Sequence, residues 1–257
     1  SYLIDKFKED SNDYKYIRVP NDIEDKKRIL RSLMNIRLPK QMEEAVLEVQ
    51  DEYLQECIEE NGIVHIDSIN EIKRGISIWQ GDITRLAVDA IVNAANSQML
   101  GCFIPMHTCI DNCIHSYAGI QLREECNQKM QDLRKKFGPD YEQPTAVPMV
   151  TEAYNLPAKK VIHVVGPIVE NGLNSTLEKQ LMDCYWNVLE ICKEYRLKTV
   201  AFCCISTGVF HFPNRRAAEL AVKTVEKWLE CNPNTIERVI FNVFKDEDKA
   251  IYKQLLS

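Results

Sequence analysis

From residue 75 onward, short apolar runs rich in β-branched residues alternate with longer amphipathic segments. This alternation constrains the fold most strongly, because strands joined by helix-length connections form a largely parallel sheet. Strands are expected at five places, 76–79, 90–92, 161–165, 199–205 and 239–244. Helices are expected at 111–135, 175–195, 214–230 and 246–256. The pattern predicts an α/β fold whose sheet is covered by helices on both faces, with ligands bound beyond the carboxyl ends of the strands.

Residues 1–74 show a different, helical pattern. The segment 19–22, Val-Pro-Asn-Asp, is typical of a helix start, and an apolar face follows at Ile23, Ile29, Leu30, Leu33 and Met34. A second helix is expected from near Pro39 to Asn61, with Gly62 as its stop and an apolar stripe at Val46, Val49, Tyr53 and Cys57. We therefore expect a helical extension, 1–74, packed on a main domain, 75–257.

The composition of the 257-residue chain argues against two classes of partner. A formal net charge of -6 offers no basic surface for nucleic acid. No apolar run is long enough to cross a bilayer, and residues 2–10 alternate charged and hydrophobic side chains instead of forming a signal peptide. A cytoplasmic protein with no nucleic-acid and no membrane partner is the expectation.

Most of the ten cysteines fit buried free thiols in a reducing compartment. Cys203 and Cys204 are adjacent in an apolar run, and Cys184 and Cys192 have helical spacing. The exception is the group around His107, which belongs to a predicted loop.

That loop carries Cys102, His107 and Cys109, which can converge on one metal ion. Two thiolates and one imidazole suit Zn²⁺, and three protein ligands leave a fourth position for water or substrate, as catalytic sites require. The spacing demands a looped backbone, for which Gly101 and Pro105 are suited. The alternative is a reduced, cysteine-rich loop with a solvated histidine, and the residues by themselves leave both open.

Three further residues compete as ligands. His115 falls one turn after Asp111 if Asp111 begins a helix, so it is expected to face the core or a ligand pocket. Cys113 is interpreted as a packing residue. His163 lies in an apolar strand and is expected to be a hydrogen-bonded core histidine.

Two other loops follow predicted strands. In residues 81–84, Gly-Asp-Ile-Thr, the carboxylate of Asp82 can accept from an exocyclic amine or cap the next helix. Residues 205–210, Ile-Ser-Thr-Gly-Val-Phe, precede a predicted helix, and their successive N–H groups suit a diphosphate. A tight structural turn is the alternative for this second loop.

Together these stretches resemble the macrodomain family, which binds ADP-ribose. The matching motifs are GDIT at 81–84, DAIVNAAN at 89–96, IDNCIHSYAG at 110–119, YNLPAKKVIHVVGP at 154–167 and CISTGVF at 204–210. The segment GCFIPMHTCIDN at 101–112 stands where most relatives have a glycine-rich loop. It resembles the zinc-dependent microbial branch of the family, whose members also carry a helical amino-terminal extension.

The resemblance implies a three-layer αβα sandwich with a mixed central sheet and ADP-ribose across the sheet crest. Asp82 would bind the adenine amine, assisted by the Ile83 N–H, and Phe244 would stack on adenine instead of packing in the core. Asn93 and Asn96 would lie near the distal ribose. The diphosphate would be held by a loop consisting of Ser206, Thr207, Gly208, Val209 and Phe210.

The resemblance also implies a zinc-dependent hydrolase that removes ADP-ribose from aspartate or glutamate esters of modified proteins. Asp111 would orient the attacking water or act as a base, and Asn96 would hold the distal ribose. The alternatives are an ADP-ribose reader with a structural zinc and a deacetylase of O-acetyl-ADP-ribose. Relatives are often encoded beside a sirtuin-type transferase and a lipoyl-carrier protein, which suggests the carrier as the modified partner.

Some positions depart from the family pattern. His211 follows the phosphate loop where relatives commonly have Gly, so its side chain can contact a phosphate or narrow the pocket. Ala146 and Pro148 stand in a stretch where relatives have Gly and Ala, and the local loop is expected to differ.

Overall fold

The computed structural model describes residues 1–257, which form two compact units. The first unit consists of Ser1–Gly62, Leu100–Tyr141 and Tyr154–Leu156. The second consists of Ile63–Met99, Glu142–Ala153 and Pro157–Ser257. Both units are discontinuous in sequence, and the division between residues 74 and 75 stays a prediction.

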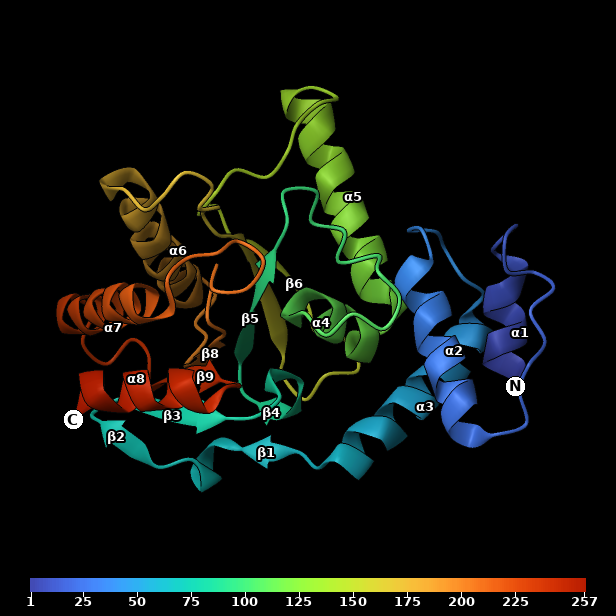
Figure 1. Ribbon diagram of the computed structural model, residues 1–257, viewed down its shortest axis with the longest axis horizontal. Coiled ribbons are helices and arrows are strands. Elements are labelled where there is room, and N and C mark those ends of the chain that lie inside the picture. Colours follow the sequence, from blue (N-terminus) through green and yellow to red (C-terminus); the bar gives the residue numbers. More distant parts are fainter. The chain divides into compact units, whose positions relative to one another are not determined.

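A seven-stranded mixed sheet forms the centre of the second unit (Figure 1). Its strands, in spatial order, are β2 (Glu71–Lys73), β3 (Ile76–Gln80), β9 (Arg238–Val243), β8 (Thr199–Phe202), β5 (Ala90–Ala95), β7 (Lys160–Val165) and β6 (Met149–Glu152). The five inner strands are parallel, and β2 and β6 are antiparallel edges. Nearly every residue of β5, β7, β8 and β9 is buried. Burial on both sides explains why these strands are continuous apolar runs instead of alternating patterns.

The five predicted strands are confirmed, with two changes in length. β5 continues past residue 92 to Ala95, since its register with β7 extends to Val165. β8 ends at Phe202, its last pairing with β9, and the chain then turns into the loop at Ser206, where φ is +66°. The strands β1 (Val64–His65) and β4 (Leu86–Ala87), which form a separate two-stranded sheet, and the edges β2 and β6 were not predicted.

Three helices accompany the sheet in the second unit, α6 (Ser175–Glu194), α7 (Asn214–Cys231) and α8 (Asp246–Leu256), as the sequence predicts. Asn174 caps α6 by accepting a hydrogen bond from the Leu177 N–H at 3.0 Å. α6 packs against β7 and α7, and α8 packs against β3 and β9. The largest fully buried side chain of these helices is Trp228.

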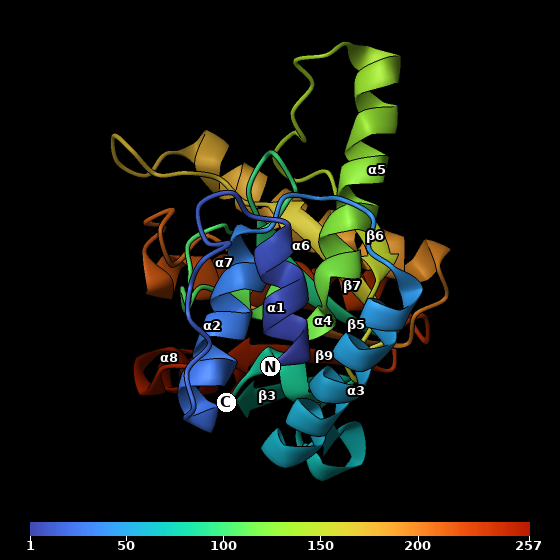
Figure 2. The same ribbon diagram turned by 90° about the vertical axis from the view of Figure 1, so that its right-hand side faces the viewer.

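The first unit is helical. It contains α1 (Tyr2–Glu9), α2 (Ile23–Ile36), α3 (Glu44–Asn61), α4 (Ile110–Ala118) and α5 (Ile120–Phe137). α1 packs against α2 and α3 (Figures 1 and 2), and α2 and α3 also contact α4. One apolar core joins α1, α2, α3 and the start of α5, formed by Leu3, Ile4, Phe7, Leu30, Leu33, Met34, Val46, Leu54 and Ile120.

The start of α2 is confirmed, because the Asp22 carboxylate caps it by accepting from the N–H groups of Glu24 and Asp25. Its apolar face is confirmed at Leu30, Leu33 and Met34, whereas Ile23 is exposed.

The sequence-based account of α3 is partly wrong. α3 begins at Glu44 instead of near Pro39 and ends at Gly62 as predicted, with φ +80° at that glycine. Its buried stripe is Val46, Gln50, Leu54 and Ile58, so Val49 faces outward and only Val46 of the predicted stripe is fully buried.

The helix expected at 111–135 is two helices, separated at Gly119. Gly119 has φ +100°, a backbone conformation that residues other than glycine rarely adopt. A Cβ there would lie 2.7 Å from the Gln121 side chain. The helix α1 was not predicted, although its Leu3, Ile4 and Phe7 are buried.

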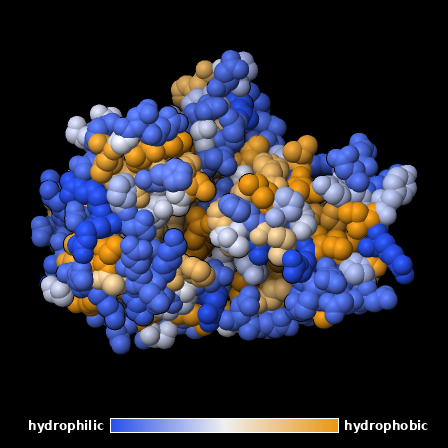
Figure 3. Space-filling model, in the orientation of Figure 1, coloured by the Kyte–Doolittle hydropathy of each residue, from blue (hydrophilic) through white to orange (hydrophobic).

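The face of the molecule in Figure 3 is largely hydrophilic, with hydrophobic side chains in scattered groups. No helix is both long and apolar enough to cross a membrane. All ten cysteines are free, and Cys184, Cys192 and Cys203 are buried as predicted.

Candidate functional site

Four of the predicted site segments follow strands of the second unit at the same edge of the sheet. β3, β9, β8 and β5 are mutually parallel, so their carboxyl ends lie at one edge. Asp82 follows β3, Phe244 follows β9, Ser206 follows β8 and Asn96 follows β5. Loops at this edge are the usual ligand-binding position in open α/β sheets.

Asp82 is half-buried and caps a short 3₁₀ turn, Ile83–Arg85. Its Oδ1 accepts hydrogen bonds from the Thr84 backbone N–H at 2.9 Å and from the Thr84 hydroxyl at 2.7 Å. The capping interpretation is therefore confirmed. Oδ2 makes no hydrogen bond within the chain, so the same carboxylate can still accept from an amine.

Phe244 is not a core aromatic. Its side chain is 77% exposed directly after β9. Its backbone is fixed instead, because Gln80 Nε2 donates to the Phe244 carbonyl at 3.2 Å and to Asp246 Oδ1 at 2.7 Å. An exposed ring on a fixed backbone offers a flat apolar surface for stacking.

The loop after β8 is shaped by unusual backbone geometry. Ser206 adopts φ +66° and is buried, and Gly166 lies so close that a Cβ on it would be 2.0 Å from the Ser206 hydroxyl oxygen. The Phe212 N–H closes the loop on the Ser206 carbonyl at 3.0 Å. The N–H groups of Gly208, Val209 and Phe210 donate to no backbone or side-chain group of the chain. They remain available to phosphate oxygens, as in other backbone anion sites.

His211 and Ala146, two of the positions expected to depart from the family pattern, share an unusual backbone conformation. Both adopt a left-handed backbone, with φ +57° at His211 and +64° at Ala146. Glycine reaches this region at the lowest cost. The side chain of His211 is exposed beside the loop.

The two asparagines after Val92 differ in burial. Asn93 is fully buried in β5, and its Nδ2 lies 3.0 Å from His163 Nδ1. His163 Nε2 lies 2.9 Å from the Thr151 hydroxyl, so His163 is the hydrogen-bonded core histidine that the sequence predicts. Asn96 is half-buried past the end of β5, and its Oδ1 accepts from the Gln98 N–H at 3.1 Å. Any ribose contact from Asn93 would therefore be indirect, whereas Asn96 is partly accessible.

In the first unit, Cys102, His107 and Cys109 converge. Their ligand atoms all lie within 4.8 Å of one another, and Cys102 Sγ is 3.5 Å from His107 Nδ1. All three residues are partly exposed. Two sulfurs and one imidazole nitrogen that meet at one point form a donor set suited to Zn²⁺.

The loop that carries this trio depends on two left-handed residues. Gly101 has φ +82°, and a Cβ there would lie 2.8 Å from the His115 ring, so the glycine predicted for the turn is required for two reasons. Met106, directly before His107, has φ +58°, which the sequence did not indicate.

Cys109 is the N-cap of α4, and its Sγ accepts from the Asn112 N–H at 3.4 Å. Burial is the main cause that raises the pKa of the Cys109 thiol to about 12, against the lowering effect of the Asn112 N–H. Without a cation this thiol is protonated near neutral pH, and a bound metal ion must displace its proton.

Asp111 lies in the first turn of α4 and is buried, with its Oδ1 3.6 Å from His115 Nε2. The prediction that His115 follows it by one turn is confirmed. Cys113 does not belong to the group formed by Cys102, His107 and Cys109. Its Sγ accepts a hydrogen bond from Arg31 Nη2 at 3.7 Å. Three residues around the loop, Arg31, Asn35 and Arg123, were missed by sequence reasoning, since nothing in their local pattern distinguishes them from other helical residues.

The Macro domain family model matches residues 92–221, about half of the chain. The chain belongs to the macrodomain family. It is 44% identical to a protein-ADP-ribose hydrolase of Treponema medium over 260 aligned positions, which cover 100% of this chain and 97% of the relative. It is 40% identical to a protein-ADP-ribose hydrolase of Staphylococcus aureus strain Mu50, covering 100% of this chain and 94% of that protein.

Solved macrodomains share the architecture. The Trypanosoma brucei macrodomain in complex with ADP-ribose superposes with a TM-score of 0.67 and 25% identity, covering 88% of this chain and 95% of that one. The Oceanobacillus iheyensis macrodomain with ADP gives a TM-score of 0.62 and 34% identity, covering 73% and 93%. The fold is thus the αβα macrodomain fold with a mixed central sheet and an N-terminal helical part, as the resemblance implied.

Proposed function

We propose that this macrodomain is a zinc-dependent hydrolase that removes mono-ADP-ribose from aspartate and glutamate esters of modified proteins. The observation that carries the proposal is the convergence of Cys102, His107 and Cys109 within 4.8 Å, directly before Asp111. The names of the two relatives, which match over nearly their whole length, support the same reaction class.

The second unit supplies the groups for ADP-ribose. Asp82 Oδ2 would accept from the adenine amine with the Ile83 N–H beside it, and the exposed Phe244 ring would stack on the base. The free N–H groups of the loop 206–210 would bind the diphosphate. The Trypanosoma brucei macrodomain, which shares the fold, was solved in complex with ADP-ribose, and this supports ADP-ribose as the ligand.

Cys102, His107 and Cys109 would hold the zinc ion, and their chemistry and mutual distances fit it. When bound, zinc supplies Lewis-acid polarisation and lowers the pKa of water in its open position. Hydrolysis adds water across the ester, which returns the carboxylic acid of the protein and leaves a hydroxyl on the distal ribose.

The chain's own residues would orient the reactants. Asn96 would hold the distal ribose so that the scissile bond is fixed in position, which lowers the entropic part of the barrier. Asp111 would accept a hydrogen bond from the attacking water and align it or take its proton. Its buried carboxylate lies 3.6 Å from His115 Nε2.

The direct test is incubation with a protein mono-ADP-ribosylated on aspartate or glutamate, followed by chromatography of the released nucleotide. A modified lipoyl-carrier protein is one substrate to include. The proposal predicts free ADP-ribose and an unmodified protein. Binding of the modified protein without release would make the chain a reader with a structural metal and overturn the proposal. Turnover of O-acetyl-ADP-ribose that far exceeds turnover of the protein ester would make it a deacetylase.

A further inference from the structure

The helix α2 contacts the metal-binding loop through two polar side chains. Arg31 Nη2 donates to the His107 carbonyl oxygen and to Asn112 Oδ1, each at 3.0 Å. One turn later, Asn35 Oδ1 accepts from the Met106 N–H at 3.0 Å. Both contacts fall on the backbone of His107 or of the residue before it, so they act on the segment that aims the imidazole.

Asn35 is buried and hydrogen-bonded through both ends of its amide. Its side chain is 1% exposed, and its Nδ2 donates to the Ser116 hydroxyl at 2.9 Å. The Met106 N–H that it accepts belongs to the left-handed residue with φ +58°. A residue other than glycine rarely adopts a left-handed backbone unless neighbouring contacts stabilise it, and this hydrogen bond is such a contact.

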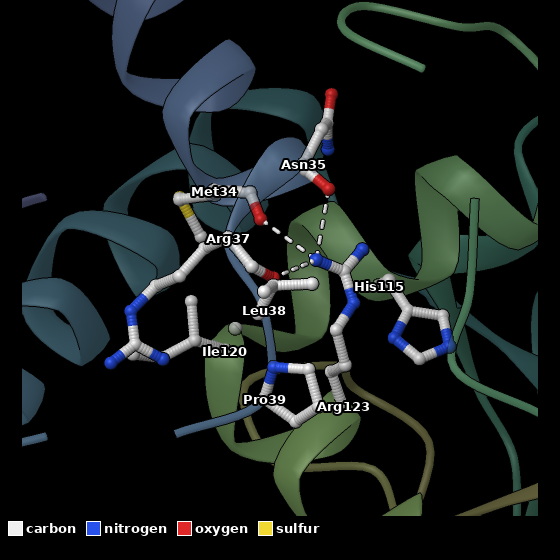
Figure 4. A pocket seen from close by; sticks show the side chains of 9 residues that line it. Met34, Asn35, Arg37, Leu38, Pro39, His115, Ile120 and Arg123 are labelled. Atoms are coloured by element: carbon white, nitrogen blue, oxygen red, sulfur yellow. Dashed lines mark hydrogen bonds between the residues drawn. The ribbon is translucent and has the colours of Figure 1, made fainter. Parts of the chain in front are cut away.

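Arg123 of α5 links the start of the metal-binding loop to the C-terminal end of α2. Its Nε donates to the Leu100 carbonyl at 2.7 Å and its Nη2 to the Cys102 carbonyl at 3.4 Å. Its Nη1 donates to three carbonyl oxygens at the C-terminal end of α2 (Figure 4), those of Met34, Asn35 and Arg37 at 3.2, 2.8 and 2.6 Å. The guanidinium also lies 4.1 Å from the centre of the Phe103 ring.

These contacts join α2 to the loop at two of the three ligand residues, Cys102 and His107. We propose that α2 is a positioning element for the metal-binding loop, so that the amino-terminal helices set the zinc affinity of the site. The inference rests on the proposed zinc site. Groups that orient metal ligands change metal affinity by about ten- to a hundredfold when they are removed.

The first experiment compares Arg31→Ala with Arg28→Ala. Arg28 lies on the same helix, is exposed and makes no side-chain hydrogen bond or ion pair, so its removal matches the loss of charge and helix context. Zinc dissociation constants are measured by competition with a chromogenic chelator, and the absorption spectrum of the Co²⁺-loaded protein reports the ligand geometry. Arg31→Ala should bind zinc about ten- to a hundredfold more weakly and change the Co²⁺ spectrum, whereas Arg28→Ala should match the wild type.

The outcomes separate the two proposals. Wild-type protein that binds zinc, together with unchanged affinity and spectrum in Arg31→Ala, overturns the positioning role alone. Wild-type protein that binds no zinc overturns the metal site and the inference that rests on it.

A second experiment needs no metal. Amide exchange of Met106 is measured by NMR in metal-free wild type, Asn35→Ala and Asn35→Asp. The N–H should exchange at least about tenfold faster in Asn35→Ala, because its acceptor is gone, and Asn35→Asp should restore protection because the acceptor oxygen remains. Equal exchange rates in all three proteins would contradict the role of α2.

Discussion

The loop at 204–210, proposed to bind the diphosphate, and the loop at 101–109, proposed to bind the metal, are held in shape in different ways. The first is closed by its own backbone, with Ser206 at φ +66° against Gly166, and its functional groups are backbone N–H groups. The second is held from outside by side chains of α2 and α5 that lie far away in sequence, such as Arg31, 76 residues before His107. The shape of a loop held by its own backbone depends mainly on its local sequence. The shape of a loop held by side chains from other helices depends on how those helices pack.

The variant expected to separate the two loops most strongly is His107→Ala, which removes one of the three proposed ligands and leaves 204–210 intact. Zinc affinity and ester hydrolysis should each fall by more than about a hundredfold, because losing a ligand costs more than losing a group that orients one. ADP-ribose affinity, measured by calorimetry, should stay within about twofold. The control is Cys231→Ala, an exposed cysteine at the end of α7. A large fall in ADP-ribose affinity in His107→Ala would show that the loops are not separate.

The converse variant is Gly166→Ala, which is expected to disturb the loop at 204–210 and to leave the loop at 101–109 intact. A Cβ at this position would lie 2.0 Å from the Ser206 hydroxyl and 2.8 Å from an Ile205 side-chain carbon. Overpacking of this kind costs about 1–3 kcal/mol of stability, and ADP-ribose affinity should fall at least about tenfold as the loop shifts. Zinc content should be unchanged. Adding Ser206→Ala should recover part of the lost affinity, and no recovery would mean that the clash is not the cause.

The central strand β5 is anchored at its start by Asp89. Its carboxylate is 2.7 Å from the Lys159 ammonium and accepts from the Lys198 N–H, also at 2.7 Å. Burial acts to raise the pKa of Asp89, but these hydrogen bonds outweigh it and hold that pKa below its usual range. A carboxylate with a lowered folded-state pKa stabilises the fold above its unfolded pKa, and this contribution is lost as the pH falls through the folded value.

Asp89→Asn should therefore lower the free energy of unfolding by about 2 kcal/mol near neutral pH, and the difference from wild type should shrink below about pH 4. Urea unfolding at several pH values measures it. Asp183→Asn is the matched control, because its exposed pair with Lys179 on α6 should contribute less than about 1 kcal/mol. A difference that grows toward low pH would contradict the assignment.

The smallest expected effect is that of Phe244→Ala. Stacking of a base on an aromatic ring contributes about 1–3 kcal/mol, so ADP-ribose affinity should fall about tenfold. Stability should hardly change, because the ring is 77% exposed. Phe137→Ala, a second exposed aromatic, should leave the affinity unchanged. If both variants bind alike, adenine does not stack at Phe244.

Elements that depend on local sequence could be predicted, whereas those that depend on distant contacts could not. The inner strands were predictable because they are short apolar runs, which are buried in β5, β7, β8 and β9 and partly buried in β3. The start of α2 was predictable because Asp22 is a capping residue. The edge β2 was missed because it is only three residues long, all exposed, with the single apolar residue Ile72 between two charged ones. The stripe of α3 was placed wrongly because it buries a polar residue, Gln50, whose side chain accepts from the Ile120 N–H. Hydrophobic periodicity cannot detect such a position.

In the candidate site, local motifs predicted the convergence of Cys102, His107 and Cys109 and the open N–H groups of the loop at 204–210. The supporting groups Arg31 and Asn35 could not be predicted, because their partners lie 76 and 71 residues away and become neighbours only when the helices pack. Asn93 shows a different kind of failure. The motif placed it near the distal ribose, but its side chain is fully buried, with Nδ2 3.0 Å from His163 Nδ1.

The central claim, that the loop at 101–109 holds a zinc ion needed for hydrolysis, is tested most directly by one titration. Wild-type protein is stripped with a chelator, and release of ADP-ribose from a glutamate-modified protein is followed as zinc is added back. Activity should be absent in the stripped protein and should return in proportion to bound zinc, reaching its maximum at one ion per chain. Full activity of the metal-free protein would contradict the claim.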